Sequence, residues 1–324
     1  MSKKIIITGA AGFIGSRLAE ICVKNGYEVT AFDKYNSFNN FGWLENSKYK
    51  QYIKFSHGDV RDLDTVMSKF KKNNIVLHLA ALVGIPYSYE APLSYIKTNI
   101  EGTYNVLEAS RNYNFDQILI TSTSEVYGSA QKIPISEDHP LVGQSPYSAS
   151  KIAADQIAMS YYKSFGSPVK IVRPFNTFGP RQSLRAIIPQ IILQLQNDKK
   201  KIYFGNITPT RDLTFVDDTC EGFLQIMKRK AFFGTVTNIG SKNEISVKNL
   251  IIKISKLMNI NKNIVFDKNR VRPKKSEVDR LVCDNFKIVK NSNWKPKFTL
   301  DQGLFKTIEW MSNNNKNIKN EYVI

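Results

Sequence analysis

The stretch Gly9-Ala10-Ala11-Gly12-Phe13-Ile14-Gly15 decides how this chain folds. It follows an apolar run, Lys4–Thr8, and it opens a second run, Phe13–Asn25, whose apolar residues recur at helical spacing. Glycines between a strand and a helix permit a tight turn and let a pyrophosphate approach the helix N-terminus. The stretch therefore predicts a dinucleotide-binding turn, in which the cofactor-binding residues are Gly9, Gly12, Phe13, Ile14 and Gly15.

The acidic residue expected at the cofactor's adenosine is Asp33. It ends the second predicted strand, Glu28–Phe32, 18 residues after Gly15. A carboxylate at this point accepts hydrogen bonds from ribose hydroxyls and repels a 2′-phosphate, which favours NAD over NADP. Asp59 and Val60 follow a third strand and are expected to meet the adenine; a solvated Asp59 at a strand end is the alternative.

Strands and helices alternate through the first half of the chain. Further strands are predicted at Lys54–His57, Ile75–Leu79, Gln117–Thr121 and Val169–Val172, and helices at Thr98–Tyr113 and Ser148–Phe165. This alternation predicts an α/β fold with a doubly wound parallel sheet of the Rossmann type. After Pro174 the rhythm changes, which indicates a second, smaller domain.

Composition excludes several classes of protein. The chain has 324 residues, 42% of them hydrophobic, and a formal net charge of +18. No apolar run reaches the roughly 18 residues of a membrane span, and the N-terminal strand is too short for a signal peptide, so we expect no membrane partner. Three cysteines without CxxC spacing predict no metal site and no disulfide, and a cytoplasmic location. The positive charge alone would suit nucleic-acid binding, but the sequence has no recognition helix and no basic motif interleaved with aromatic residues, so we expect no nucleic-acid partner.

A tyrosine and a lysine four residues apart carry the chemistry. Tyr147 and Lys151 lie on one face of the helix predicted near them, downstream of a hydroxyl-rich segment, Thr121–Gly128. A nearby ammonium lowers the pKa of a phenol, so Tyr147 is expected to act as a base, with Thr123 as proton relay. His78 ends the fourth strand, where a buried, hydrogen-bonded imidazole is expected rather than a catalytic one.

Several segments together resemble the extended short-chain dehydrogenases/reductases, in the group of NAD-dependent nucleotide-sugar epimerases and dehydratases, over essentially the whole chain. They are Thr8–Gly15, Asp59-Val60, His78–Ala81, Asn99, Thr121–Gly128, Tyr147–Lys151, Arg173–Asn176, Gly179-Pro180, Thr210–Asp212 and Arg272-Pro273.

The resemblance implies a catalytic set of Thr123, Tyr147 and Lys151, with Lys151 also at the nicotinamide ribose. It places Leu79, Ala80 and Ala81 against the cofactor, and Asn99 either at the cofactor or in support of the nearby helix. It implies an NAD-binding domain at residues 1–174, with a returning segment near 211–240, and a nucleotide-sugar-binding domain mainly at 175–324.

The pair Ser124-Glu125 helps to distinguish which reaction follows the first step. The shared first step oxidises C4 of the sugar, and a carboxylate beside the relay hydroxyl suits removal of the C5 proton afterwards. The 4,6-dehydratases usually carry Asp-Glu here, so either Ser124 with a water or Glu125 itself is the expected acid at the 6-hydroxyl. Ser-Glu also resembles the uronate decarboxylases, although those tend to have serine where this chain has Asp212.

Two further stretches, Ala81–Pro92 and Gly179–Gln190, resemble the 4,6-dehydratases of the legionaminic acid pathway. That likeness implies a GDP- or UDP-linked N-acetylglucosamine as substrate; a nucleotide-sugar 4-epimerase or a UDP-glucuronate decarboxylase is the alternative. The substrate-binding residues that it implies are Ser88, Asn176, Arg181, Arg185, Arg211 and Arg272, of which Arg181 and Arg185 are equally well explained as solvated arginines. The family also implies a homodimer through a four-helix bundle of helices that begin near Pro92 and Tyr147.

Overall fold

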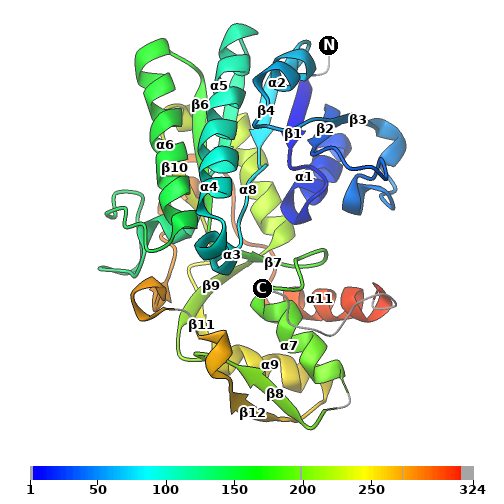
Figure 1. Ribbon diagram of the computed structural model, residues 1–324, viewed down its shortest axis with the longest axis vertical. Helices are drawn as coiled ribbons and strands as arrows, with labels where there is room; N and C mark the ends of the chain where they lie inside the picture. Colours follow the sequence, from blue (N-terminus) through cyan, green and yellow to red (C-terminus); the bar gives the residue numbers. More distant parts are fainter. Residues whose placement is uncertain (1–2, 198, 272, 315–324) are drawn as a thin grey trace.

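A computed structural model describes residues 3–197, 199–271 and 273–314. Its larger part is built on a seven-stranded sheet in the order β10-β6-β5-β4-β1-β2-β3, in which every neighbouring pair runs parallel (Figure 1). The doubly wound α/β prediction is confirmed. The strands are β1 Lys4–Thr8, β2 Glu28–Asp33, β3 Ile53–His57, β4 Ile75–His78, β5 Gln117–Thr121, β6 Val169–Pro174 and β10 Val236–Ile239.

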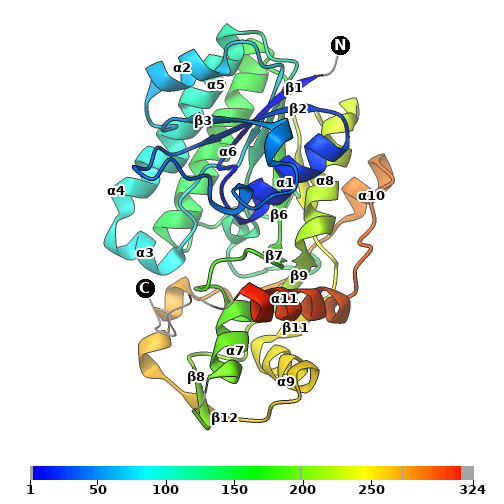
Figure 2. The ribbon, with the colours of Figure 1, turned by 90° about the vertical axis from the view of Figure 1, so that its right-hand side faces the viewer.

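Helices cover both faces of this sheet (Figures 1 and 2). On β1, Ile5 and Ile7 join the core cluster that contains residues of α1 and α8, whereas Ile6 joins the cluster that contains residues of α2, α5 and α6. Strands buried on two faces read as continuous apolar runs, which explains Ile5-Ile6-Ile7. The helices are α1 Phe13–Lys24, α2 Leu63–Phe70, α3 Ile85–Glu90, α4 Pro92–Tyr95, α5 Gly102–Asn112, α6 Pro146–Phe165 and α8 Val216–Lys228.

Helix α6 begins earlier than the predicted Ser148. Ser145 is its N-cap, and Ser145 and Ser148 form a reciprocal capping box with Pro146 in the first turn. The helix ends at Gly166, whose φ of 66° is the left-handed conformation that glycine adopts at little cost. Capping therefore places Tyr147 in the first helical turn, at the carboxyl edge of the sheet.

The helix predicted at Thr98–Tyr113 is not continuous. Ile96–Glu101 forms a π-helical segment, and α5 follows from Gly102. A Cβ at Gly102 would lie 2.8 Å from the Val60 side chain, so the chain packs too closely there for a larger residue. The extra backbone residue in a π segment rotates the helix face and is frequent near functional sites.

The smaller part of the molecule carries two small sheets, β11-β9-β13 with β7 beside β9, and β12-β8. Helix α11 packs against β9 and α9 (Figure 2). Thr210–Phe215 joins this part as β9, while the chain returns to the large sheet through α8 and β10. The remaining elements are β7 Asn176–Phe178, α7 Ile187–Gln196, β8 Lys201–Phe204, β9 Thr210–Phe215, β11 Glu244–Ser246, α9 Val247–Met258, β12 Asn263–Phe266, β13 Arg280–Leu281, α10 Phe286–Asn291 and α11 Leu300–Asn314.

Candidate active site

The glycine turn packs against the end of β4. Gly9 has a φ of +70°, and a Cβ there would lie 2.8 Å from the backbone nitrogen of Ala80. A Cβ at Gly15 would lie 2.2 Å from the carbonyl oxygen of Gly9. Neither position has room for a side chain, so the turn leaves its backbone bare at the N-terminus of α1, as the approach of a pyrophosphate requires.

Asp33 is fixed beside this turn. Its Oδ2 accepts a hydrogen bond of 2.7 Å from the backbone N–H of Ala11, and its Oδ1 accepts one of 2.8 Å from Lys34 N–H. Burial raises the pKa of this carboxyl, and the two backbone donors oppose that rise. The carboxylate therefore stands at the end of β2, where an adenosine ribose bound over the glycine turn is expected to lie.

Asp59 and Val60, both expected at the adenine, have different surroundings: the first forms an ion pair and the second is buried. The Asp59 carboxylate pairs with Arg61 at 2.6 Å, and the hydrogen bond from Arg61 holds the pKa of Asp59 below its usual range. Val60 is buried, and its carbonyl oxygen accepts a hydrogen bond of 2.9 Å from Asn105. The Asp59 side chain is thus already held by its neighbour, while Val60 forms part of the packed wall.

The end of β4 is held by a buried imidazole, as predicted. His78 Nδ1 lies 2.7 Å from the Thr8 hydroxyl, and Nε2 lies 3.2 Å from the Thr103 hydroxyl. Burial, with a smaller contribution from Lys151, lowers the pKa of His78 to about 3. The Thr8 hydroxyl also accepts from the backbone of Leu79 and Ala80, so a neutral His78 fixes the predicted cofactor-facing segment.

Asn99 joins the β4 edge to the catalytic helix. Its Oδ1 accepts from Leu82 N–H at 2.9 Å, and its Nδ2 donates to the Leu82 carbonyl at 3.0 Å and the Ser150 hydroxyl at 2.9 Å. Because the amide is fully buried and all its hydrogen bonds go to protein, it supports the site in this structure rather than projecting into it.

The predicted catalytic residues come together at the carboxyl ends of β5 and β6. Thr123 caps the 3₁₀ turn Ser124–Tyr127, and its side chain shares a hydrogen bond with the Tyr147 hydroxyl. Tyr147 and Lys151 are 7% and 4% exposed. Among the described residues, none accepts a hydrogen bond from the Lys151 ammonium, so this buried donor fits a ligand hydroxyl such as that of a ribose.

One expectation about Tyr147 is wrong. The Lys151 ammonium was expected to lower the pKa of the phenol, but burial raises the pKa of Tyr147 well above its usual range, and the Thr123 hydrogen bond opposes this only partly. Burial also lowers the pKa of Lys151, which weakens the ammonium as a source of positive charge. Desolvation dominates because Tyr147 lies in the interior, and Lys151 is not among the charges that act most strongly on the phenol.

Ser124 and Glu125 are both nearly buried beside this cluster, at 2% and 9% exposure. The negative charge of Glu125 is one of the causes that raise the pKa of Tyr147, which places the carboxylate near the phenol. No other described residue forms a hydrogen bond with the Glu125 carboxylate. A nearly buried carboxylate whose charge acts on Tyr147, and which no described residue holds by a hydrogen bond, is a candidate for proton transfer with a ligand.

The predicted substrate residues are more scattered. Asn176, on β7, buries its Oδ1 without a hydrogen-bond partner, as a side chain directed at a ligand does. Ser88 is fully buried and donates to the Ile85 carbonyl at 2.6 Å within α3. Arg185 is exposed, and its charge acts on the nearby Tyr95 by opposing the effect of burial on the pKa of that phenol.

Two of the predicted arginines remain. Arg211 is held by the Thr210 carbonyl at 2.8 Å and by Glu277 at 3.5 Å. Arg272 lies outside the described residues.

Arg181 was expected at the nucleotide, with a solvated arginine as the alternative, and in this structure it pairs with a residue of α1. Its guanidinium donates to the Ser16 hydroxyl at 3.2 Å and to the Glu20 carboxylate at 2.8 Å, on α1. The buried acceptor Glu20 had no signal in the sequence, because a single acidic residue in an amphipathic helix reads as a surface position.

Asp155 is a second residue without a predicted role. It stands four residues after Lys151 on α6 and pairs with Arg173 of β6 at 2.7 Å. The i, i+4 spacing from Lys151 was the signal that the sequence offered.

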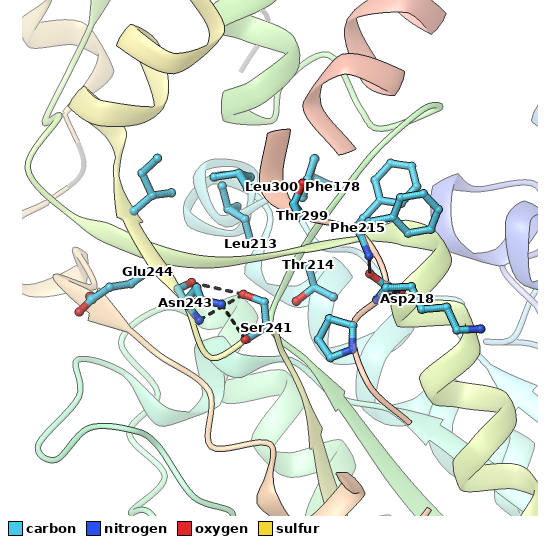
Figure 3. Close-up of a pocket in the computed structure, with 14 residues that line it drawn as sticks. Phe178, Leu213, Thr214, Phe215, Asp218, Ser241, Asn243, Glu244, Thr299 and Leu300 are labelled. Carbon is cyan, nitrogen blue, oxygen red and sulfur yellow. Dashed lines mark hydrogen bonds between the residues drawn. The ribbon is translucent and has the colours of Figure 1, made fainter. Parts of the chain in front are cut away.

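A separate pocket of about 460 Å³ lies on β9, away from this cluster (Figure 3). Phe178, Leu213 and Phe215 line it together with residues 296–300. The Asp218 carboxylate at its rim accepts from the backbone N–H groups of Lys297 and Phe298, and it thereby joins α8 to the approach of α11. None of the predicted catalytic residues lines this pocket.

The sequence predicts neither a metal site nor a membrane-spanning helix. In residues 3–197, 199–271 and 273–314, no group of three His, Cys, Asp or Glu side chains is arranged to hold a metal ion, and the three cysteines are buried and free. Within the same ranges, none of the helices combines the length and the apolar character that crossing a membrane demands.

The chain is similar to known proteins over nearly its whole length. A family model described as GDP-mannose 4,6 dehydratase matches residues 6–307. A putative UDP-glucose 4-epimerase of Methanocaldococcus jannaschii is 31% identical over 96% of this chain and 99% of its own length. Human dTDP-D-glucose 4,6-dehydratase is 31% identical over 98% of this chain and 93% of its own.

Among solved structures, DesIV, a dTDP-glucose 4,6-dehydratase of Streptomyces venezuelae with NAD bound, superimposes with a TM-score of 0.86. It is 26% identical over 96% of this chain and 98% of its own. The cofactor is therefore NAD, and the bare glycine turn, Asp33 and the unpaired Lys151 ammonium are suited to hold it.

Proposed function

Since the chain belongs to the extended short-chain dehydrogenase/reductase family of NAD-dependent nucleotide-sugar dehydratases and epimerases, we propose that it is a hydro-lyase: a 4,6-dehydratase of a GDP- or UDP-linked N-acetylglucosamine, as in the legionaminic acid pathway. The observation that carries this proposal is the Glu125 carboxylate, which is nearly buried beside the Tyr147 phenol and forms no hydrogen bond with a described residue. A 4-epimerase has no proton to remove from C5, whereas a dehydratase needs a base there.

The residues of this chain perform the proton transfers. The Tyr147 phenolate, hydrogen-bonded to Thr123, takes the proton of the sugar 4-hydroxyl and becomes the phenol, while Lys151 orients the ribose of the cofactor and stabilises the phenolate before the transfer. When bound, NAD would supply the two-electron oxidation at C4 and the matching reduction at C6, so the reaction has no net redox change. Glu125 removes the C5 proton, and the 6-hydroxyl leaves as water once it is protonated, with Glu125 or a water on Ser124 as the acid.

The raised pKa of Tyr147 means that the phenol holds its proton in the protein alone. The positive charge of bound NAD⁺ and the Lys151 ammonium would oppose that rise and favour the phenolate that the first step needs. The proposed substrate arrives with a diphosphate, for which Arg211 and Arg272 are the proposed partners and Asn176 a further contact.

Incubation of the purified protein with GDP- and UDP-N-acetylglucosamine, followed by mass spectrometry, tests the proposal. We expect loss of one water from one of the two, and none with Tyr147→Phe as the matched control. An unchanged mass with both sugars contradicts the proposal. Release of CO₂ from UDP-glucuronate would instead identify a decarboxylase, as Ser124 allows, and inversion at C4 seen by NMR would identify an epimerase.

We also propose that the protein acts as a homodimer through α4, α5 and α6. Leu93, Ile96 and Tyr104 precede or lie on α5 and are 60%, 50% and 42% exposed, and Phe165 at the end of α6 is 55% exposed. Apolar side chains of this size on neighbouring helices favour burial against a second copy. Light scattering should give twice the mass of one chain, and Leu93→Asp should reduce it to a single chain.

A further inference from the structure

An ion pair is buried beneath the catalytic helix. Asp155 stands on α6, one turn beyond Lys151, and Arg173 stands on β6; both are about 1% exposed. Arg173 Nη2 donates to Asp155 Oδ2 at 2.7 Å. Removing two charges from water costs free energy that a buried pair recovers only with complete hydrogen bonding, so a pair at this place calls for a reason beyond stability.

The Asp155 carboxylate ties three elements of the site together. The Ser122 hydroxyl donates to its Oδ2 at 2.5 Å, and Arg173 Nε donates to the same hydroxyl at 3.1 Å. Ser122 directly precedes Thr123, the hydrogen-bond partner of Tyr147. One carboxylate thus connects the end of β5 and β6 to the helix that carries both Tyr147 and Lys151.

The pair is not completely hydrogen-bonded. Asp155 Oδ1 and Arg173 Nη1 are both buried without a hydrogen-bond partner, although the Arg173 guanidinium lies over the Tyr127 ring, 4.7 Å from its centroid. A pair selected for stability alone is expected to satisfy these atoms. Because no hydrogen bond is donated to Oδ1, its negative charge acts more strongly on the neighbouring groups.

Those groups are the catalytic ones. Burial lowers the pKa of Lys151, and Asp155 is the charge that opposes this effect. Burial also raises the pKa of Tyr147, and Glu125, Tyr95 and Asp155 add to that rise. The same carboxylate therefore acts on both halves of the Tyr–Lys pair.

Of the charges on the other elements packed against α6, Glu125 of the 3₁₀ turn Ser124–Tyr127 also raises the pKa of Tyr147, whereas Asp155 is the charge that acts on Lys151. His78 of β4 faces Lys151 and is neutral, because its pKa is about 3. On the π-helical segment, Lys97 and Glu101 are exposed, as is Glu90 on α3. On α5, Glu108 bonds to Tyr161 and to Arg111.

We propose that Asp155 is a positioning residue for the proton transfer, one that keeps Lys151 charged in a buried site and holds the Thr123 end of β5 against the catalytic helix. The proposal rests on the roles proposed for Tyr147 and Lys151, which dehydration, epimerisation and decarboxylation share. It therefore stands whichever of the three reactions the protein performs.

The pH dependence of kcat/KM in the variant Asp155→Asn tests this proposal. Loss of the negative charge lowers the pKa of both Tyr147 and Lys151, so the acid limb and the basic limb should each move to lower pH by about one unit. A purely structural role predicts a lower maximum with both limbs in place. Ser160→Ala, at an exposed position on the same helix, is the matched control, since it removes a hydroxyl without touching Asp155 or Thr123, and its limbs should not move.

A second measurement requires no substrate. In protein labelled with ¹³C at tyrosine Cζ, the Tyr147 signal is the one absent from Tyr147→Phe, and its titration should move to lower pH in Asp155→Asn. If that variant does not fold, Asp155→Leu/Arg173→Met replaces the pair with apolar residues of similar volume and removes the same carboxylate. A folded variant without the carboxylate whose limbs and Tyr147 titration match the wild type overturns the proposal. If no sugar is turned over but the Tyr147 signal shifts, the proposed reaction fails and this inference survives.

Discussion

Arg181 donates a 2.8 Å hydrogen bond to the Glu20 carboxylate, and this contact joins the loop after β7 to the helix behind the glycine turn. Glu20 is 4% exposed and also accepts from the Ser47 hydroxyl at 2.8 Å. Although burial acts to raise the pKa of Glu20, the hydrogen bond and charge of Arg181 bring it below its usual range. The loop that resembles a substrate-binding segment is thus anchored to the cofactor-binding part of the chain.

Replacing Glu20 should destabilise the protein and weaken the anchoring of the loop after β7. In Glu20→Gln, Arg181 keeps its place in the interior without a compensating charge, so we expect a loss of about 3 kcal/mol in the free energy of unfolding. Urea denaturation measures this loss. KM for the nucleotide sugar should rise as the loop loses its anchor, whereas Glu309→Gln, at an exposed position on α11, should change neither quantity. Wild-type stability in Glu20→Gln would show that the contact contributes nothing.

Tyr147→Phe should abolish turnover while preserving the fold. The phenyl ring keeps the edge-on packing against Tyr95, whose centroid lies 6.2 Å away, but the proton acceptor is gone. We expect kcat to fall by roughly two to four orders of magnitude. The NAD released on denaturation should match the wild type, because the glycine turn, Asp33 and Lys151 are unchanged. Turnover within about tenfold of the wild type would remove Tyr147 from the mechanism.

Glu125→Gln should separate oxidation of the sugar from loss of water. The amide occupies the same volume but cannot take the C5 proton, so dehydration should fall by roughly two to four orders of magnitude. Reduction of the quenched reaction with borodeuteride should then trap a sugar labelled at C4. Ser124→Ala is the comparison: if it alone blocks water loss, the acid is a water held by Ser124. Full dehydration by Glu125→Gln would contradict the assignment of the base.

His78 should make the fold sensitive to acid. Its pKa is about 3 in the folded protein, below the usual histidine value of 6.5, so between these two pH values the unfolded chain binds a proton that the folded chain does not. Stability should therefore be complete above about pH 6.5 and should fall by a few kcal/mol as the pH approaches about 3. Urea midpoints across this range measure the effect. His78→Gln should have a shallower pH dependence, and an equal slope would assign the acid sensitivity to other groups.

Local sequence signals predicted the large sheet and the core of the catalytic cluster. Glycines at Gly9 and Gly15, an apolar strand before them and Asp33 after the next strand are local features whose spacing follows from strand and helix geometry. Tyr147 and Lys151 were found for the same reason, since one helical turn separates them. The break in the helix at Ile96–Glu101 was not found, because a π segment and an α-helix share the same hydrophobic pattern.

The sequence by itself predicted the strands and most of the helices in the first half of the chain, the cofactor turn and the candidate acid–base residues, because each depends on neighbours within a few positions. Tertiary structure decided what these side chains do. It paired Arg181 with Glu20 and Asp155 with Arg173, and it raised the pKa of Tyr147 where its lysine neighbour alone predicted a decrease. Burial and long-range charge pairs set these outcomes, and both depend on residues that meet only when distant segments pack together.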